Sequence, residues 1–126
     1  MKIRVYYEDT DAGGIVYHSK YLNFCERARS EEFFKRGMMP AEGDESGFVV
    51  RKITADFLSS AKLGDLLEIK SRPKEIKHTS LALTQEIFKD STALFRMEVQ
   101  LVYVVNGKIK RIPKDIFDIL ERIGKP

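Results

Sequence analysis

Strict alternation of apolar residues with other residues is the clearest pattern in this chain. From position 93 to position 105 every odd position is apolar: Ala93, Phe95, Met97, Val99, Leu101, Tyr103 and Val105. Because successive side chains of a β-strand point to opposite faces, this period of two predicts a strand with one face toward a core. On the alternate face Leu94, Val102 and Val104 stand beside charged residues, which indicates partial burial of that face against another molecule.

Shorter strands are indicated wherever β-branched and aromatic residues lie between turn signals. A two-residue turn of the I′ kind is indicated by Asn106-Gly107. We expect strands at 2–7, at 47–57, in a hairpin pair that turns at 77–79 and turns again at 89–91, and in a brief return after the Asn-Gly turn.

The strand expected at 47–57 carries a charged residue in its apolar phase. Val49, Ile53, Ala55 and Phe57 fall on one face if the alternation is unbroken. Arg51 shares this phase, so its side chain points inward unless a bulge intervenes. A buried arginine would then need a partner, because a lone buried charge is costly.

A long helix is predicted from Ser19 to Arg36, because good helix formers fill this stretch without proline or glycine. Gly37 follows where a C-terminal cap belongs. Arg29 and Glu32 fall within the apolar arc one turn apart, so a buried ionic network is expected there. The helix must bury a broad face, whose stripe consists of Tyr21, Phe24, Cys25 and Ala28, widened by Leu22 and Phe33.

The order of these elements is one strand, one long helix and then four strands joined by short turns, which excludes parallel crossovers among the later strands. It predicts an α+β fold in which one curved antiparallel sheet of about five strands wraps around the helix. Pro113 opens a short C-terminal helix. With 126 residues, no repeat and no linker, the chain is expected to be a single domain over 1–126, with the polar loop at 40–47 its most mobile part.

Charge and cysteine content narrow the classes of function. The 22 basic and 19 acidic residues are interleaved and give a net charge of +3, and no basic face emerges from the strand phases, which argues against nucleic-acid binding. Cys25 stands alone, so no internal disulfide can form, and a reducing, cytoplasmic location is expected. No apolar run approaches the roughly 20 residues of a membrane span, and the N-terminus lacks the apolar region of a signal peptide.

Candidate chemistry gathers in the loop "EDTDAGGIVYH" between the first strand and the long helix. A loop that runs into a helix N-terminus offers unpaired backbone N–H groups and the positive end of the helix dipole, which favour an oxyanion. Gly13 and Gly14 let a ligand approach the main chain closely. The Asp11 carboxylate could attack a carbonyl or direct a water onto it, while the amides near Tyr17 and His18 stabilise the developing charge. This pattern indicates acyl transfer to water.

Each of these residues also has a plainer interpretation. Asp9 and Asp11 fit the role of turn and capping residues, which is common for aspartate in a glycine-rich loop. His18 fits a structural hydrogen-bonding role just before a helix. No metal site is expected from these three residues, because His78 is remote and no Cys/His cluster accompanies them. Cys25 lies on the buried stripe and is not expected to act as a nucleophile.

The same residues carry a resemblance. The stretch "YYEDTDAGGIVYHSKYLNFCERARSEEF", followed by "FVVRKITADF" and "LGDLLEI", resembles the hotdog-fold acyl-CoA thioesterases, in particular the YbgC-type branch of the 4-hydroxybenzoyl-CoA thioesterase-like family. The likeness covers nearly the whole chain, and its spaced motif Y-x-x-x-D-x-x-G-x-V-Y-H-x-x-Y runs from Tyr7 to Tyr21. It implies that Asp11 is the catalytic carboxylate and that His18 donates its backbone N–H to the thioester oxygen. Relatives often carry Pro-Ala where this chain has "SSA" at 59–61, so the edge of the binding groove is expected to differ.

The resemblance also implies partners. It implies a homodimer with joined sheets, in which each active site lies between a loop of one subunit and the strands of the other, often paired again into a homotetramer. Coenzyme A is then part of the substrate, and no separate cofactor is expected. Cations at strand ends and turns would hold the phosphates of coenzyme A. The candidate substrate-binding residues are Tyr7, Gly14, Tyr17, Lys62, Lys77 and His78, with Arg72 and Lys74 as further cations.

Two alternatives stay open from the sequence. Asp11 could attack the thioester directly, which gives a mixed anhydride, or it could activate a water. The domain could also be a non-catalytic hotdog module that binds acyl-CoA or acyl carrier protein without cleaving it, and acyl carrier protein is an alternative acyl donor. The presence of both Asp11 and His18 favours hydrolysis over binding alone.

Overall fold

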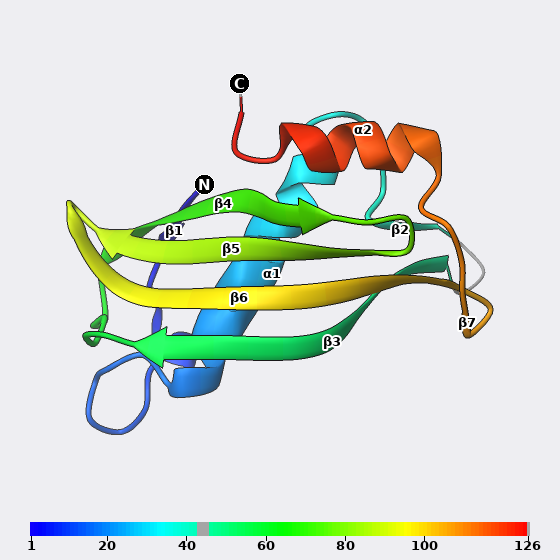
Figure 1. Cartoon of the computed structure of the whole chain (residues 1–126). Helices are drawn as coiled ribbons and strands as arrows, with labels where there is room; N and C mark the ends of the chain where they lie inside the picture. Colours follow the sequence, from blue (N-terminus) through cyan, green and yellow to red (C-terminus); the bar gives the residue numbers. More distant parts are fainter. Residues whose placement is uncertain (43–45, 126) are drawn as a thin grey trace.

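The computed structural model describes residues 1–42 and 46–125. One antiparallel sheet contains, in spatial order, β1 (Lys2–Arg4), β4 (Leu66–Ile76), β5 (Ser80–Lys89), β6 (Thr92–Val105), β3 (Ser46–Phe57) and β2 (Ala41–Glu42), and β7 (Lys108–Ile109) pairs with β6. The sheet curves around α1 (His18–Phe34), and α2 (Lys114–Arg122) lies beside the C-terminal end of α1 (Figure 1). This confirms the predicted fold class; β7 is the brief return expected after the Asn-Gly turn, and β2 is an additional short strand.

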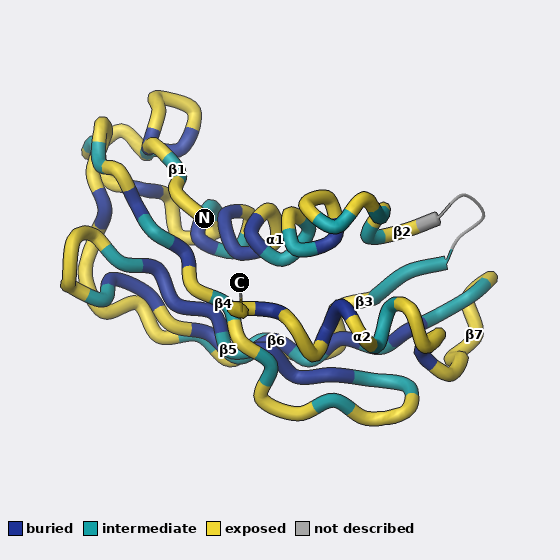
Figure 2. Tube along the Cα trace, turned by 90° about the horizontal axis from the view of Figure 1, so that it is seen from above, coloured by how far each residue is buried: buried dark blue, intermediate teal, exposed yellow. Residues whose placement is uncertain are grey.

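The core lies between α1 and the concave face of the sheet (Figure 2). The helix buries its predicted stripe, and the odd positions of β6 from Phe95 to Tyr103 are buried against it. Tyr21 stacks on Phe95 with ring centroids 5.1 Å apart, and Phe24 and Cys25 are fully buried. Both period-based predictions, the helix and the strand, are therefore confirmed.

A bulge in β3 breaks the predicted phase of that strand. Val50 pairs with Leu101, but Lys52 already pairs with the neighbouring Gln100, so Arg51 is an extra residue. Arg51 is exposed. The common phase predicted for Val49 and the residues after the bulge is wrong, because the inserted residue turns Val49 to the opposite face.

The first strand is shorter than predicted. It ends at Arg4, and a 3₁₀ turn follows at Tyr7–Asp9, where the sequence suggested continued strand. The Asp9 side chain stabilises this turn, since its Oδ2 accepts a hydrogen bond from the Tyr6 amide at 2.9 Å. The polar loop predicted at 40–47 includes β2, and its positions 43–45 lie outside the described residues.

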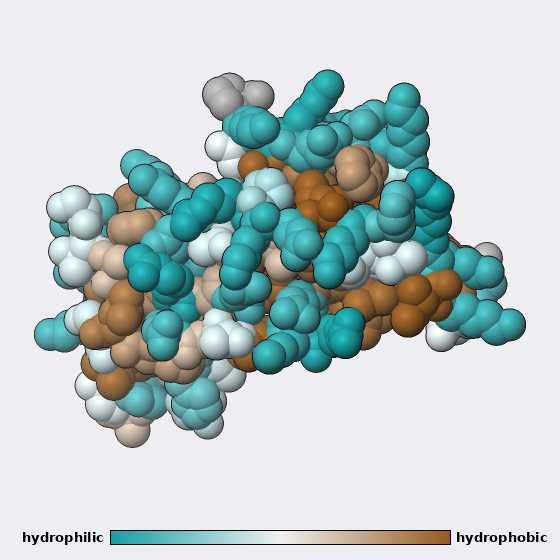
Figure 3. All heavy atoms as spheres, in the orientation of Figure 1, coloured by the Kyte–Doolittle hydropathy of each residue, from teal (hydrophilic) through white to brown (hydrophobic). Residues whose placement is uncertain are grey.

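The outer face of the sheet, which points away from α1, is hydrophilic across its middle (Figure 3). Glu86 accepts hydrogen bonds from Arg72 at 2.7 Å and Arg96 at 2.9 Å, and the Arg72 contact contributes most to lowering the pKa of Glu86. Leu94, which the pattern placed on this face, is already buried within the single chain. It therefore adds nothing to a contact with another molecule, and a tetramer through this face stays a prediction.

Arg29 and Glu32 do not form the ionic pair that their spacing suggested. The Arg29 Nη1 donates to Oε1 of the buried Gln85 at 3.3 Å, while Glu32 pairs with Lys35 at 2.8 Å and Arg36 at 2.7 Å. Burial raises the pKa of Glu32, but hydrogen bonds from Lys35 and Arg36 outweigh this effect, and the net shift is downward. The buried polar groups thus divide into two separate networks.

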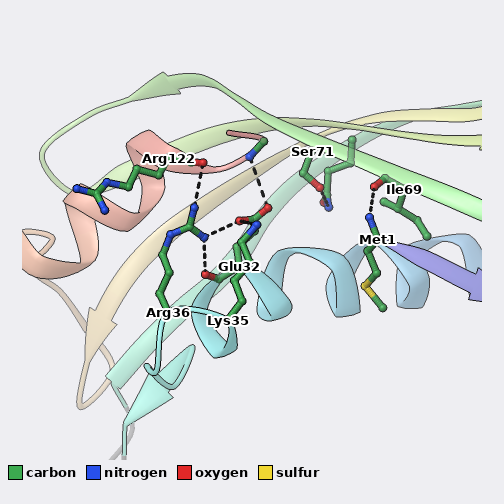
Figure 4. Close-up of polar contacts among 9 residues, drawn as sticks. Met1, Glu32, Lys35, Arg36, Ile69, Ser71 and Arg122 are labelled. Carbon is green, nitrogen blue, oxygen red and sulfur yellow. Dashed lines mark hydrogen bonds and ion pairs between the residues drawn. The ribbon is translucent and has the colours of Figure 1, made fainter. Parts of the chain in front are cut away.

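The Glu32 network attaches the C-terminal helix to α1 (Figure 4). Glu32 Oε1 accepts from the Gly124 amide at 3.5 Å, and Arg36 Nη2 donates to the Arg122 carbonyl oxygen at 3.3 Å. Leu120 and Ile123 are buried at the same junction. We call these two hydrogen bonds the α2 latch, because they hold the end of α2 in place.

Gly124→Ala is expected to lower the free energy of unfolding by about 2–4 kcal/mol. Gly124 has φ +82°, and an alanine Cβ there would strike the carbonyl oxygen of Ser71 in β4. Chemical denaturation measures the loss.

Gly37→Ala is the matched control for this change. Gly37 also has a positive φ, +75°, at the end of a helix, but no atom lies within 4 Å of the added Cβ. It should cost only about 1 kcal/mol, the penalty for the left-handed backbone alone. Equal losses for the two variants would show that the approach of Gly124 to Ser71 is not tight.

Candidate active site

The loop between η1 (Tyr7–Asp9) and α1 is a small hairpin. Thr10 and Val16 form a β-bridge, the Asp11 amide donates to the Ile15 carbonyl oxygen at 2.9 Å, and the Gly14 amide donates to the Asp11 carbonyl oxygen at 3.1 Å. Gly14 has φ +81°, a conformation that glycine adopts without steric cost. The glycine pair therefore lets the chain turn back directly after Asp11.

The two aspartates have different environments. Asp9 is only 4% exposed, and its carbonyl oxygen accepts from the Tyr17 amide at 2.9 Å, so it shapes the loop from inside. Asp11 is exposed, and its Oδ1 accepts from the Gly13 amide at 2.8 Å. Among the described residues no donor reaches Asp11 Oδ2, so this oxygen is open to a substrate or a water.

The loop after β3, which contains Ala61 and Lys62, is hydrogen-bonded to the hairpin. The Val16 amide donates to the Ala61 carbonyl oxygen at 2.9 Å, and Ile15 forms a β-bridge with Lys62. Tyr21 on α1 accepts a hydrogen bond from the Ala61 amide at 3.0 Å, and burial raises the pKa of its hydroxyl. The hairpin is thus fixed to both the long helix and the loop after β3.

Helix α1 begins at His18 with no side chain capping its N-terminus. The first amides of a helix have no intrahelical acceptor, so the His18 N–H is available to an oxyanion from outside. The His18 ring is exposed and packs against Tyr17 and Phe57, with centroid distances of 4.4 Å and 6.5 Å. The structure therefore brings the Asp11 carboxylate and an uncapped helix N-terminus to one end of the sheet.

The substrate-binding candidates divide into two groups. Tyr7, which is 84% exposed, lies in η1 just before the hairpin, and Gly14, Tyr17 and Lys62 belong to the hairpin or to the loop that supports it. Lys77 and His78 lie in the β4–β5 turn at the other end of the sheet (Figure 1).

The register of β6 gives the separation of the two groups. Phe57 pairs with Phe95, near the hairpin, whereas Ser80 beside the β4–β5 turn pairs with Val102. The two ends are about 24 Å apart at the usual rise of a strand. Within one chain the structure does not bring Lys77 and His78 to Asp11.

Phe57 is a site residue that the sequence pattern did not single out. The alternation placed it on the core face of β3, but its side chain is 54% exposed and its ring contacts His18. Exposed apolar residues gather at this end of the molecule, where β3 ends (Figure 3), among them Ile15, Tyr17, Leu58 and Leu63. The aromatic residue that closes the strand, followed by another apolar residue, was the available signal.

The described residues form neither a cluster of metal ligands nor a helix that could span a membrane. No three His, Cys, Asp or Glu side chains in this part of the chain converge as metal ligands. No helix among the same residues is long and apolar enough to span a membrane.

Comparison with known proteins assigns the family. The model of the thioesterase superfamily matches residues 13–95, which include the hairpin glycines, α1 and most of the sheet. The chain belongs to the thioesterase superfamily. Within this superfamily it is 43% identical over 122 residues to the acyl-CoA thioester hydrolase YbgC of Escherichia coli O6:H1, covering 90% of this chain and 89% of the relative. The YbgC-type resemblance is therefore confirmed.

Other thioesterase relatives agree in sequence and fold. An acyl-CoA thioesterase YbgC of Helicobacter pylori is 53% identical over 88 residues, and the match covers 70% of this chain but only 65% of that relative. A probable thioesterase from Bartonella henselae superimposes with a TM-score of 0.83 at 33% identity over 90% of this chain and 97% of that one. The shared architecture is the hotdog fold.

Proposed function

We propose that this thioesterase-superfamily chain hydrolyses acyl-CoA thioesters, with Asp11 as the catalytic carboxylate. The observation that carries the proposal is the exposed Asp11 carboxylate held in a tight hairpin beside the uncapped start of α1. The names of the Escherichia coli and Helicobacter pylori relatives support acyl-CoA as the substrate class. Coenzyme A enters the reaction only as part of the substrate, and the lone buried Cys25 supports a cytoplasmic setting.

The proposed chemistry divides between the hairpin and the helix. The thioester oxygen accepts a hydrogen bond from the His18 amide, which stabilises the negative charge that develops as the carbonyl carbon becomes tetrahedral. Either Asp11 Oδ2 forms the new bond to this carbon, or Asp11 takes a proton from a water that forms it. The C–S bond then breaks and the thiolate of coenzyme A leaves. In the first route water hydrolyses the resulting anhydride to release the acid.

A homodimer follows from the free edge of β3. Beyond its short pairing with β2 at Ser46 and Gly47, β3 has β6 on one side and no strand on the other among the described residues. An exposed edge of this length invites pairing with a second copy, and a twofold axis makes that pairing antiparallel. We propose that two sheets join there. Pairing of dimers into a tetramer remains a further expectation.

The joined sheet also brings the two groups of binding candidates together. Antiparallel pairing along β3 places the hairpin end of one subunit beside the other end of its partner, where the β4–β5 turn lies. Lys62 of one chain and Lys77 and His78 of the partner subunit then flank one site. Their charges suit the phosphates of coenzyme A.

A thioester panel tests the proposed function. The protein is incubated with short, long and aromatic acyl-CoAs and with an acylated acyl carrier protein, and free thiol is measured. Release from at least one acyl-CoA is expected, whereas release from the carrier protein alone would make that protein the donor. Tight binding of acyl-CoA without any thiol release would show a non-catalytic module instead.

A further inference from the structure

A cavity of about 480 Å³ lies between the second half of α1, the concave face of the sheet and α2. This volume is within the usual range for small-molecule sites. Its buried lining is entirely apolar and consists of Phe33, Leu81, Leu83, Leu101, Leu120 and Ile123. We call it the chain cavity.

The chain cavity opens at one side and is closed at the other. At the β3 edge its lining residue Val50 is exposed, as are Ala41 in β2 and Glu26 on α1. At the opposite side Leu120 in α2 and Ile123, which directly follows α2, are buried. A molecule that enters at the β3 edge would therefore extend toward α2 and stop there.

The chain cavity is remote from the catalytic hairpin of its own chain. Arg29, which lines it, lies about three turns or 16 Å along α1 from His18. Helix α1 and strand β3 run in opposite directions, since His18 packs near Phe57 and Phe33 lines the same cavity as Phe48. In the proposed dimer, antiparallel pairing of the two β3 edges brings the partner's Asp11 to the side where the cavity opens.

We infer that the chain cavity holds the straight aliphatic chain of the thioester that the partner's Asp11 attacks, and that Leu120 and Ile123 limit its length. This inference rests on the proposed function and on its dimer. An aliphatic chain suits the cavity because all six of its buried lining residues are apolar, and among the described residues only the partly buried Arg29, Ser30 and Ser46 and the exposed Glu26 add polar side chains to the lining. The hydroxyl of a hydroxylated aromatic ring would be paired only where it reached Arg29, Ser30 or Ser46, because a buried hydroxyl without a partner is costly.

The α2 latch fixes the position of Leu120 and Ile123, which close the far end of the chain cavity. Arg36 and Glu32 bind the main chain at Arg122 and Gly124, on both sides of Ile123. Leu120 and Ile123 should therefore keep their positions when a longer acyl chain enters, and so exclude it. The structure assigns the C-terminal helix to acyl-length selection, although it lies far from the hairpin in the same subunit.

Two substitutions of Leu120 test this role. Leu120→Ala deepens the cavity and is expected to raise the ratio of kcat/KM for long over short straight-chain acyl-CoAs by about tenfold, the usual value of one or two methylenes in a pocket. Leu120→Phe shortens the cavity and is expected to lower the same ratio by about tenfold. The free volume beside Leu120 can hold the larger ring, so Leu120→Phe should fold even if Leu120→Ala proves destabilising.

Ile119→Ala is the matched control. Ile119 is buried on the same helix but does not line the cavity, so its truncation should destabilise α2 without changing the chain-length ratio. If the wild type releases thiol and the folded Leu120 variants keep its ratio, the inference is overturned while the thioesterase function stands. The same holds if Ile119→Ala changes the ratio as much as Leu120→Ala. If the wild type cleaves no acyl-CoA, the proposed function fails, and this inference fails with it.

Discussion

Asp11→Asn is expected to lower kcat by about a hundredfold or more while leaving the fold intact. Asparagine keeps an oxygen that can accept the hydrogen bond from the Gly13 amide, so the hairpin should retain its shape. It loses the negative charge that either attacks the thioester or takes a proton from water. Thiol release under saturating acyl-CoA measures kcat, and thermal unfolding checks the fold.

Asp9→Asn is the control that distinguishes an effect on the shape of the loop from an effect on the chemical step. Asp9 is buried and bonded to the Tyr6 amide, so its substitution should lower the melting temperature more than Asp11→Asn does and reduce kcat much less. A variant at Asp11 that keeps more than half of the wild-type kcat would rule out Asp11 as the catalytic carboxylate.

Activity is expected to depend on association, and dilution below the dimer dissociation constant should abolish nearly all of it. The physical reason is the separation within one chain, because the hairpin with Asp11 and the turn with Lys77 and His78 lie at opposite ends of the sheet. In the proposed dimer, a second copy paired along β3 completes a site that contains both. Sedimentation and thiol release, measured over one dilution series, should show specific activity falling as the dimer fraction falls.

A fully active monomer would contradict this expectation. It would show that one chain contains the whole site, and the antiparallel pairing along β3 would lose its functional role. A constant specific activity while sedimentation reports a changing dimer fraction would have the same meaning.

The long elements were predictable because their signals are local. A period of two over β6 and a run of helix formers over α1 each fix which face is buried, and both faces are found as expected. The bulge at Arg51 was not predictable in the same way. Val49 and Val50 are both apolar, so the sequence fits either phase, and the choice depends on pairing with Leu101 and Gln100 in β6.

The candidate site shows the same limit. The spaced motif located the hairpin and the helix start, but it could not show that Asp9 is buried and Asp11 exposed, because that difference depends on contacts with the Tyr6 and Tyr17 amides. No local sequence pattern could predict the chain cavity. Its walls come from α1, the four strands β2, β3, β5 and β6, and α2, which meet only when the sheet curves.

Because Asp11 lies at one end of α1 and the chain cavity at the other, two defective alleles should complement each other if the proposed dimer forms. In a mixed dimer of an Asp11→Asn subunit and a Leu120→Phe subunit, one site carries both defects. The other site combines an intact Asp11 with an intact cavity. Co-expression of the two alleles should therefore give more long-chain hydrolysis than either allele alone, because each alone is expected to support only a small fraction of it.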